Sequence, residues 1–321
     1  MKTMGFLISH KAQEKRRALL PQDLLNIRNC HNIFIEKNYG ESLRIDDQEY
    51  ENFGAKVAER KEVLKCDCLV DVKLGDGDFL EEIEGEKTLI GWAHALQKVA
   101  FTTSAIEKKH TVIAWENIYV DGRYIFYRNR EVAGEAGVLQ AFLYLGKMPY
   151  ECNVAILGNG QTAKGAMRIL HGLGANVDVY GRRLEKLFKE KMYAYDVIVN
   201  CILWDTSRQD HIIAREDLKK FRPGTMIIDI ANDPGMEIET ARPTTIADPV
   251  YEIDGVIHYE VDNTPALFPY TVSHILSKGF STYVDGILED CPAPEINQAI
   301  VIKDGVILSE DILAYRKKLN L

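Results

Sequence analysis

The chain has 321 residues, of which 46% are hydrophobic and 27% are charged, and its formal net charge at pH 7 is −9. This length and composition are typical of a globular protein with room for two domains, each with its own core. Lys and Arg occur only in short clusters, which argues against a protein that binds the phosphate backbone of nucleic acid. No apolar stretch reaches the length of a membrane span or a signal peptide, so we expect no membrane partner and a cytoplasmic location.

Cysteine and histidine spacing gives no sign of a metal site. The six cysteines form no paired CxxC units and fit a reduced cytosol: Cys30, Cys66, Cys68, Cys152, Cys201 and Cys291. The eight histidines show no metal-ligand spacing either. We therefore expect no metal ion.

The first 115 residues alternate β-rich runs with helical stretches, which predicts a mostly parallel sheet wrapped by helices. The expected strands are residues 4–9, 32–36, 68–73, 88–94 and 111–115. Ligands of open α/β sheets bind beyond the carboxyl ends of the strands. Arg16, Lys73 and His94 fall at such ends.

These three side chains suit a small oxo acid. The guanidinium of Arg16 can clamp a carboxylate, while the ammonium of Lys73 and the imidazole of His94 can polarise a carbonyl and move a proton. Position alone leaves another interpretation open for each of them. Arg16 and Lys73 also fit solvated charges, and a single histidine is more often a hydrogen-bonded structural group.

A long helix over residues 131–147 leads into a strand, a glycine turn, a helix and a second strand between Val154 and Arg183. This order is typical of a dinucleotide-binding unit, in which Gly158 permits the tight turn and Gly160 lets the backbone approach a pyrophosphate. The small Ala163 lets the helix pack on the sheet. We include the helix-start residues Gln161 and Thr162 in the cofactor site.

The end of the second strand predicts which dinucleotide binds. An NAD protein places an acid there, on the ribose 2′-hydroxyl, whereas this chain has Gly181 followed by Arg182 and Arg183. A 2′-phosphate suits these two arginines, so we expect NADP(H). The alternative is that both arginines merely solvate the end of the strand.

Apolar runs at 197–203, 225–231 and 255–261 predict the remaining strands of this sheet. The residues expected to contact the dinucleotide at the ends of these strands are Cys201, Ile202, Leu203, Ile230 and Asn263. Asp233 follows the second of these strands, where it can face the substrate, although an acid before a proline is also a good turn former.

After Pro269 a helix is expected to run toward Leu288, followed by a strand-turn-strand around Asp304 and a terminal helix. We expect this tail to rejoin the first domain. The predicted fold class is α/β, with a Rossmann dinucleotide-binding domain and a discontinuous Rossmann-like substrate domain. The expected boundaries are 1–130 and 276–321 for the substrate domain and 131–275 for the NADP-binding domain.

Seven segments together resemble the alanine dehydrogenase and lysine-forming saccharopine dehydrogenase superfamily, and within it the carboxyethylornithine synthase family. They span nearly the whole chain: 14–21, 72–73, 90–94, 156–160, 180–183, 229–233 and 261–265. The resemblance implies that Arg16 handles the oxo-acid carboxylate, Lys73 its carbonyl oxygen and His94 proton transfer. It also implies that Asp233 lies by the substrate and that Asn263 and Thr264 lie near the nicotinamide.

The resemblance further implies a reaction: NADPH-dependent condensation of pyruvate with the side-chain amine of ornithine or lysine through an imine, in an enzyme that forms homo-oligomers. The alternatives are alanine dehydrogenase activity with free ammonia, and saccharopine-type chemistry, for which Arg17 or Lys98 would supply a second cation. A non-enzymatic NADP-binding protein is the alternative outside catalysis. The loop from Ala95 to Lys98 departs from the alanine dehydrogenase pattern and Lys15 stands where related sequences vary, so the amine-recognising residues are not identified.

Overall fold

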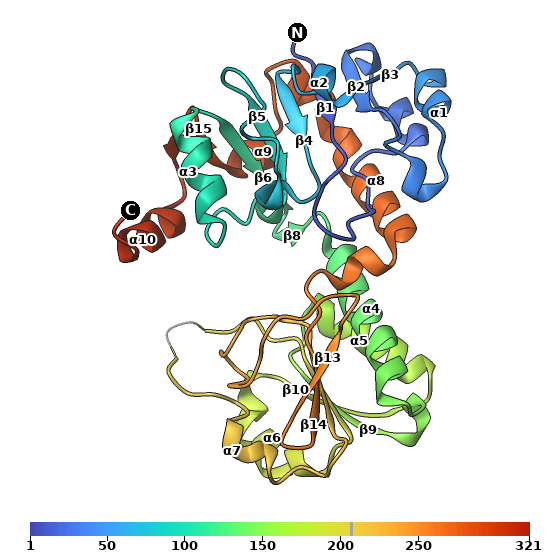
Figure 1. Cartoon of the computed structure of the whole chain (residues 1–321), viewed down its shortest axis with the longest axis vertical. Coiled ribbons are helices and arrows are strands. Elements are labelled where there is room, and N and C mark those ends of the chain that lie inside the picture. Colours follow the sequence, from blue (N-terminus) through green and yellow to red (C-terminus); the bar gives the residue numbers. More distant parts are fainter. Residues whose placement is uncertain (206–207) are drawn as a thin grey trace. The chain divides into compact units, whose positions relative to one another are not determined.

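The computed structural model describes residues 1–205 and 208–321. The chain forms two compact units, the first made of Met1–Phe126 with Pro269–Leu321 and the second of Tyr127–Phe268 (Figure 1). The α/β class expected from the sequence is confirmed: each unit contains a large, mostly parallel sheet with helices packed on it. Among the described residues, no helix combines the length and the apolar character needed to cross a bilayer.

The sheet of the first unit has eight strands in the order β16-β15-β6-β5-β4-β1-β2-β3. The strands β3, β2, β1, β4, β5 and β6 are parallel, and the tail of the chain adds β15 antiparallel to β6 and then β16 antiparallel to β15. The bounds are β1 Met4–Phe6, β2 Ile33–Glu36, β3 Lys56–Ala58, β4 Cys68–Val70, β5 Thr88–Gly91, β6 Thr111–Ala114, β15 Ile300–Lys303 and β16 Val306–Ile307. The strand order reverses at β1, which pairs with both β2 and β4, so the carboxyl ends of β1 and β4 flank a switch point.

Six helices and one hairpin complete this unit: α1 Asp47–Asn52, α2 Arg60–Val63, α3 Val99–Glu107, α8 Pro269–Leu288, α9 Pro294–Gln298, α10 Glu310–Lys318, and the strands β7 Tyr119–Val120 and β8 Arg123–Tyr124. Helix α8 buries its apolar face, where the Phe280 ring lies 6.4 Å from that of Phe6. This contact joins two segments that are far apart in the sequence.

Three strands of the first unit end three residues earlier than the sequence pattern predicts. The first is β1, which ends at Phe6 and not at residue 9. The expected strands 68–73 and 88–94 end at Val70 and Gly91. At Gly91 the backbone has φ +153° and lies so close to the carbonyl oxygen of Asp71 that a side chain would collide with it. Lys73 and His94 therefore lie in the turns that follow β4 and β5, and not in the strands.

The sheet of the second unit has six strands in the order β10-β9-β11-β12-β14-β13, of which only β13 is antiparallel. The bounds are β9 Asn153–Leu157, β10 Asn176–Tyr180, β11 Val197–Asn200, β12 Met226–Asp229, β13 Val250–Ile253 and β14 Val256–Tyr259. The chain leaves β9 for β10 on one side and returns to β11 on the other. The switch point between β9 and β11 is where a doubly wound sheet binds its ligand.

The helices of this unit are α4 Tyr127–Leu145, α5 Gln161–Gly172, α6 Glu185–Lys191 and α7 Arg215–Leu218. Helix α4 begins and ends slightly earlier than the expected 131–147. It lies directly against α5, because Gly134 faces the carbonyl oxygen of Thr162 and Gly165 faces that of Glu131, with no room for a side chain at either glycine. This packing fixes the start of α5 beneath the glycine turn.

Candidate active site

Arg16 follows β1 and is almost fully buried, with 1% of its surface exposed. Its Nε and Nη2 donate to the two carboxylate oxygens of Glu14 at 2.8 and 2.6 Å, and the guanidinium carbon lies 4.9 Å from the centroid of the Trp92 ring. A bidentate carboxylate and an aromatic face together hold the guanidinium in one orientation.

The neighbouring Arg17 has a different role. Its backbone N–H donates to Ser273, and its guanidinium donates to the carbonyl oxygens of Tyr39 and Arg16. These contacts connect the loop after β1 to α8 inside the unit. Arg17 is 4% exposed and its guanidinium is used in contacts within the unit, so it is poorly placed to supply a second substrate cation.

Lys73 lies in the turn after β4, where its backbone N–H donates to the Asp71 carboxylate at 2.7 Å. Burial raises the pKa of Asp71 to about 6. The turn packs against the end of β5, since the N–H of Gly75 donates to the carbonyl oxygen of Trp92 at 3.0 Å. Trp92 therefore adjoins both the guanidinium of Arg16 and the Lys73 turn.

His94 follows Trp92 with φ +43°, in the left-handed region. Its backbone N–H donates to one oxygen of the Glu116 carboxylate at 2.5 Å, and that of Ala93 donates to the other at 3.2 Å. Burial lowers the pKa of His94 to about 4, and the positive charge of Lys73 contributes to this shift. The imidazole is therefore neutral at physiological pH.

The structure thus brings Arg16, Lys73 and His94 together around the end of β5. Two further cations join them, because Lys98 and Lys11 both form ion pairs with the Asp76 carboxylate, Lys11 at 3.3 Å. These cations also lower the pKa of His94, while Asp76 raises it. The site as a whole suits an anionic substrate beside a neutral imidazole.

In the second unit, the glycine turn leads directly into the start of α5. Gly158 has φ +104°, and a side chain there would contact the carbonyl oxygen of Cys201. Gly160 precedes α5 as its N-cap, and a side-chain carbon at this position would have no atom within 4 Å. Gln161 and Thr162 form the first turn of the helix and Ala163 is fully buried, so the open helix start is available to an anion.

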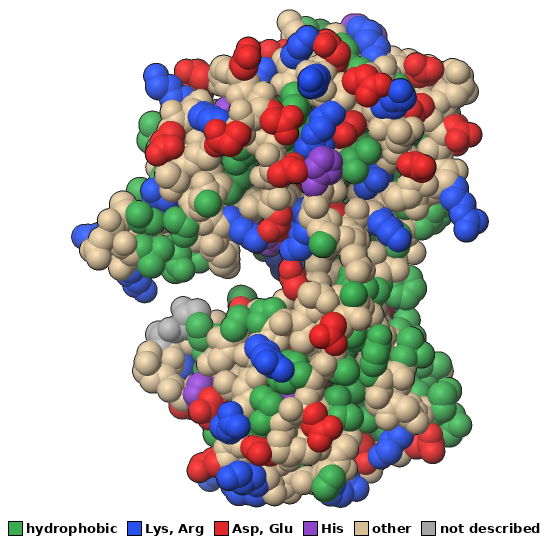
Figure 2. All heavy atoms as spheres, viewed as in Figure 1, with side chains coloured by type: hydrophobic (Ala, Val, Ile, Leu, Met, Phe, Trp, Pro, Cys, Tyr) green, Lys and Arg blue, Asp and Glu red, His purple; other side chains and the backbone are tan. Residues whose placement is uncertain are grey.

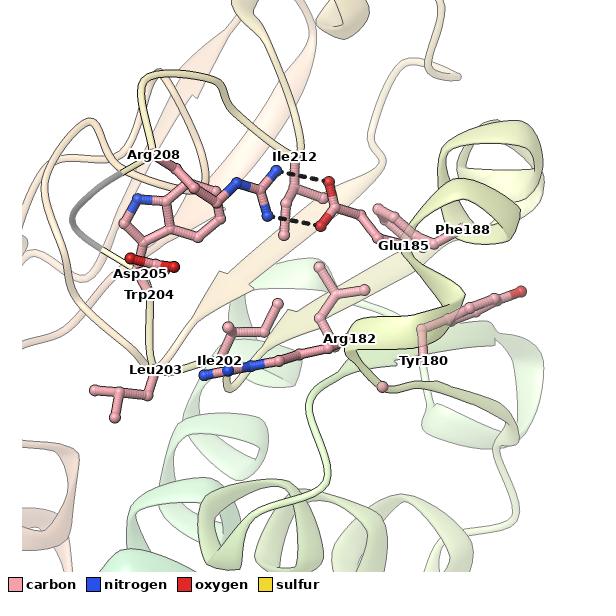
Figure 3. Close-up of a pocket in the computed structure, with 12 residues that line it drawn as sticks. Tyr180, Arg182, Glu185, Phe188, Ile202, Leu203, Trp204, Asp205, Arg208 and Ile212 are labelled. Atoms are coloured by element: carbon pink, nitrogen blue, oxygen red, sulfur yellow. Dashed lines mark hydrogen bonds and ion pairs between the residues drawn. The ribbon is translucent and has the colours of Figure 1, made fainter.

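A pocket of about 620 Å³ opens at the ends of β9, β10 and β11 (Figure 3). Its apolar lining includes Ile202, Leu203 and Trp204. The guanidinium of Arg208 lies 4.4 Å from the centroid of the Trp204 ring and donates to both oxygens of Glu185 at 2.8 Å. Figure 3 shows this pair closing one side of the pocket while Arg182 extends toward Ile202 and Leu203.

Arg182 and Arg183 are both exposed, but only Arg182 lines the pocket. Gly181 also lines it and has an ordinary backbone conformation, with φ −81°, and a side chain added there would meet no atom within 4 Å of its first carbon. The backbone would therefore accept an acidic residue here. The fold does not require glycine at this position. Compared with an acidic residue, glycine leaves the pocket without a negative charge here.

The other expected cofactor contacts follow their strands as the sequence indicates. The N–H of Cys201 donates to Leu157 and that of Ile230 to Asn200. Burial raises the pKa of the Cys201 thiol, so this group stays protonated. Asn263 takes a left-handed conformation, φ +70°, at the start of the turn Thr264–Leu267.

Asp233 belongs to the second unit, in the loop after β12. Burial raises its pKa. Beside it lie three buried carboxyls that the sequence analysis did not identify, Asp229, Glu237 and Glu260, each with one oxygen that has no hydrogen-bond partner among the described residues. Burial, together with the charges of Glu237 and Asp233, raises the pKa of Glu260 to about 7.

The sequence analysis also missed Glu116, Asp76 and the pair Glu185–Arg208. Glu116 could have been found, because it follows β6 just as His94 follows β5. Glu185 and Arg208 are 23 residues apart and meet only through the fold. Among the described residues, no group of three or more His, Cys, Asp or Glu side chains could hold a metal ion.

Comparison with known proteins places this geometry in a family. Residues 9–125 match the N-terminal domain of the alanine dehydrogenase/PNT family and residues 182–313 match its C-terminal domain. A solved L-alanine dehydrogenase superposes with a TM-score of 0.85 at 21% identity, covering 99% of each chain. That likeness establishes the fold.

The curated relatives are more specific. The N(5)-(carboxyethyl)ornithine synthase of Lactococcus lactis strain IL1403 is 34% identical, over 90% of this chain and 97% of the relative. The enzyme of the same name from Clostridium botulinum is 31% identical, over 88% and 93%. Alanine dehydrogenase 1 of Staphylococcus aureus is 28% identical, over 95% and 91%. The chain therefore belongs to the N(5)-(carboxyethyl)ornithine synthase family and, with it, to the oxidoreductases that act on CH–NH bonds.

Proposed function

We propose that this enzyme condenses pyruvate with the side-chain amino group of ornithine or lysine and reduces the resulting imine with NADPH, giving N5-(carboxyethyl)ornithine from ornithine. The observation that carries the proposal is the grouping of Arg16, Lys73 and a neutral His94 around the end of β5. The names of the relatives that align over about nine tenths of the chain support it.

Arg16 anchors the pyruvate carboxylate in this proposal. Glu14 holds the guanidinium in place through Nε and Nη2, and in this proposal the same guanidinium pairs with the substrate carboxylate. Lys73 donates to the carbonyl oxygen of pyruvate and polarises it for attack by the amine.

His94 accepts and donates the protons of the condensation in this proposal. An alkylamine arrives as an ammonium ion and must lose a proton before it can attack C2 of pyruvate. A neutral imidazole accepts that proton and then returns it to the departing hydroxyl, which leaves as water and gives the protonated imine. Glu116 is a positioning residue in this scheme, because it holds the backbone of His94 in its left-handed turn. Asp233 remains the proposed acid by the substrate on the second unit.

The dinucleotide, when bound, supplies the hydride that reduces the imine carbon. We assign the pyrophosphate to Gly158, Gly160 and the α5 start at Gln161, Thr162 and Ala163. The pocket lined by Ile202 and Leu203 takes the adenosine, with Arg182 and the exposed Arg183 at its 2′-phosphate. Cys201, Ile230 and Asn263 complete the proposed contacts.

Two enzymatic alternatives differ from this proposal in their substrates. Alanine dehydrogenase activity uses ammonia, and saccharopine-type chemistry uses 2-oxoglutarate with lysine. The second needs another cation, and Arg17 is committed to the fold. Lys98, already paired with Asp76, is the remaining candidate. A non-enzymatic NADP-binding role is set aside because the chain belongs to an oxidoreductase family.

The test is NADPH oxidation by the full chain over a matrix of oxo acids and amines. The proposal predicts turnover with pyruvate plus ornithine or lysine and none with pyruvate plus ammonia. Turnover with ammonia alone would identify an alanine dehydrogenase, and a requirement for 2-oxoglutarate would identify the saccharopine-type reaction.

We also propose a cytoplasmic homo-oligomer. All six cysteines are free thiols, as in a reducing compartment. Exposed hydrophobic side chains gather where α4 and α5 end: Leu143, Tyr144, Met148, Tyr150 and Leu173. Figure 2 shows hydrophobic surface over these helices, which supports burial of this patch against a second copy.

A further inference from the structure

The first unit has a hollow beside His94, on which the proposed function does not depend. It has a volume of about 530 Å³ and is bounded by the turn after β5, the turn after β6 and the start of α10. His94 itself lines this pocket. A substrate whose reacting nitrogen meets the imidazole can therefore extend into it.

The charge of this pocket is opposite to that of the pyruvate site. Its lining includes the carboxyl groups of Glu116 and Asp311 and, among the described residues, contains no Lys or Arg side chain. The cations Lys11, Lys73 and Lys98 are not part of it. His94 thus stands between a cationic cluster that suits an oxo acid and an acidic hollow that suits an amine.

Three polar side chains lining the pocket make no hydrogen bond within residues 1–205 and 208–321: Gln97, Asn117 and Asp311. The two amides can donate to a carboxylate, and Asp311 can accept from an ammonium group. Apolar side chains of Leu96, Val301 and Ile312 lie between them and suit a chain of methylene groups. Together these groups match the zwitterionic end of an amino acid and its aliphatic side chain.

We propose that this pocket is the recognition site for the amine substrate, and that it selects a basic α-amino acid over ammonia. The inference rests on the proposed function. The side-chain nitrogen lies at His94, the methylene groups lie on Leu96, Val301 and Ile312, and the α-ammonium group pairs with Asp311. Gln97 and Asn117 donate to the α-carboxylate. The tail of the chain thereby contributes specificity through the first turn of α10.

The test is steady-state NADPH oxidation by the full chain with pyruvate saturating and the amine varied. We expect Asp311→Asn to raise the KM for the preferred basic amino acid about 10-fold, because it removes a charge-assisted hydrogen bond. The KM values for pyruvate and NADPH should stay within about twofold, because the substitution removes no charge-assisted contact to either of those ligands. Glu310→Gln is the matched control, since it removes the same charge from the neighbouring residue, which does not line the pocket.

Substrate analogues separate the two halves of the site. 5-Aminovalerate lacks the α-ammonium group, so Asp311→Asn should leave its KM unchanged. 1,4-Diaminobutane lacks the carboxylate, so Gln97→Leu should raise the KM for ornithine and for 5-aminovalerate but not for the diamine.

Two failures are distinguishable. A wild-type enzyme that consumes no NADPH with pyruvate and any basic amino acid would overturn the proposed function, and this inference with it. A wild-type enzyme that does turn over, with an unchanged amine KM in Asp311→Asn, would overturn the pocket assignment alone.

Discussion

At the scale of single residues, the site is defined by how burial and neighbouring charge set the state of each group. His94 is the clearest case, because burial and Lys73 act in the same direction on its pKa. Glu116, which follows the neighbouring strand β6, accepts a hydrogen bond from the backbone N–H of His94 and so fixes the His94 backbone. The proposed proton chemistry therefore depends on an imidazole that is kept neutral.

The protonation state of His94 can be measured directly. We expect an NMR titration of the labelled histidines to show this ring neutral down to about pH 5, because its pKa is lowered to about 4. His94→Gln assigns the signal and should lower kcat about 100-fold or more, as is usual when a general base is removed. A titration midpoint near the ordinary value of about 6.5 would refute the role of a neutral base.

Glu260 gives a prediction about stability. Its pKa is raised to about 7, so between about pH 4.5 and 7 the folded protein holds a proton that the unfolded chain has lost. The free energy of unfolding should therefore decrease as the pH rises through this window, by up to about 3 kcal/mol from this group. Glu260→Gln stays neutral and should lose that part of the decrease.

Urea unfolding at pH 5.5 and pH 8 measures this difference. The control is Glu252→Gln, an exposed residue of β13 that lies outside the buried acids. If Glu260→Gln shows the same pH dependence as the wild type, the buried carboxyl is not protonated in the folded state.

At the scale of elements, the sequence predicted most of what places the site. Apolar runs identified the parallel strands except β3, at the edge of the first sheet, and the glycine spacing identified the β9–α5–β10 unit. The pattern missed β13, a short antiparallel strand whose residues are only partly buried, and the hairpin of β7 and β8. Such edge elements depend on pairing with distant residues more than on local periodicity.

Side-chain partnerships were harder to predict than strands. Asp229, Glu237 and Glu260 come from separate segments and meet only because β12 and β14 are neighbours. The Arg208–Glu185 pair likewise depends on the loop after β11 meeting the start of α6. Strand ends could be read from the sequence, but these contacts require the three-dimensional arrangement.

The end of β10 carries the prediction about cofactor choice. Gly181→Asp should lower kcat/KM for NADPH about 100-fold and raise that for NADH, because a carboxylate repels a 2′-phosphate and accepts from a 2′-hydroxyl. Arg182→Gln should raise the KM for NADPH more than Arg183→Gln, since only Arg182 lines the pocket. An unchanged ratio of NADPH to NADH activity in Gly181→Asp would contradict the assignment.

At the scale of the whole molecule, the chain passes from the first unit to the second and back, so that α8 and the tail complete the sheet and core of the first. The tail is therefore a structural part of the first unit. Its β15 pairs with β6, whose end carries Glu116, and α10 begins beside the His94 pocket.

Self-association is testable at the exposed patch of α4 and α5. We expect sedimentation velocity to show an oligomer for the wild type and a smaller species for Leu143→Glu, because a charge in a buried apolar contact opposes association. Leu25→Glu, at an equally exposed leucine of the first unit, is the control. A monomeric wild type at micromolar concentration would refute the oligomer.

The most direct test of the central claim follows the hydride. With NADPH that carries deuterium at the transferred position, pyruvate and ornithine should give carboxyethylornithine with one deuterium on the carbon that was C2 of pyruvate, as mass spectrometry and NMR can establish. Deuterated lactate as the product, or a coupled product without deuterium, would contradict reductive condensation at this site.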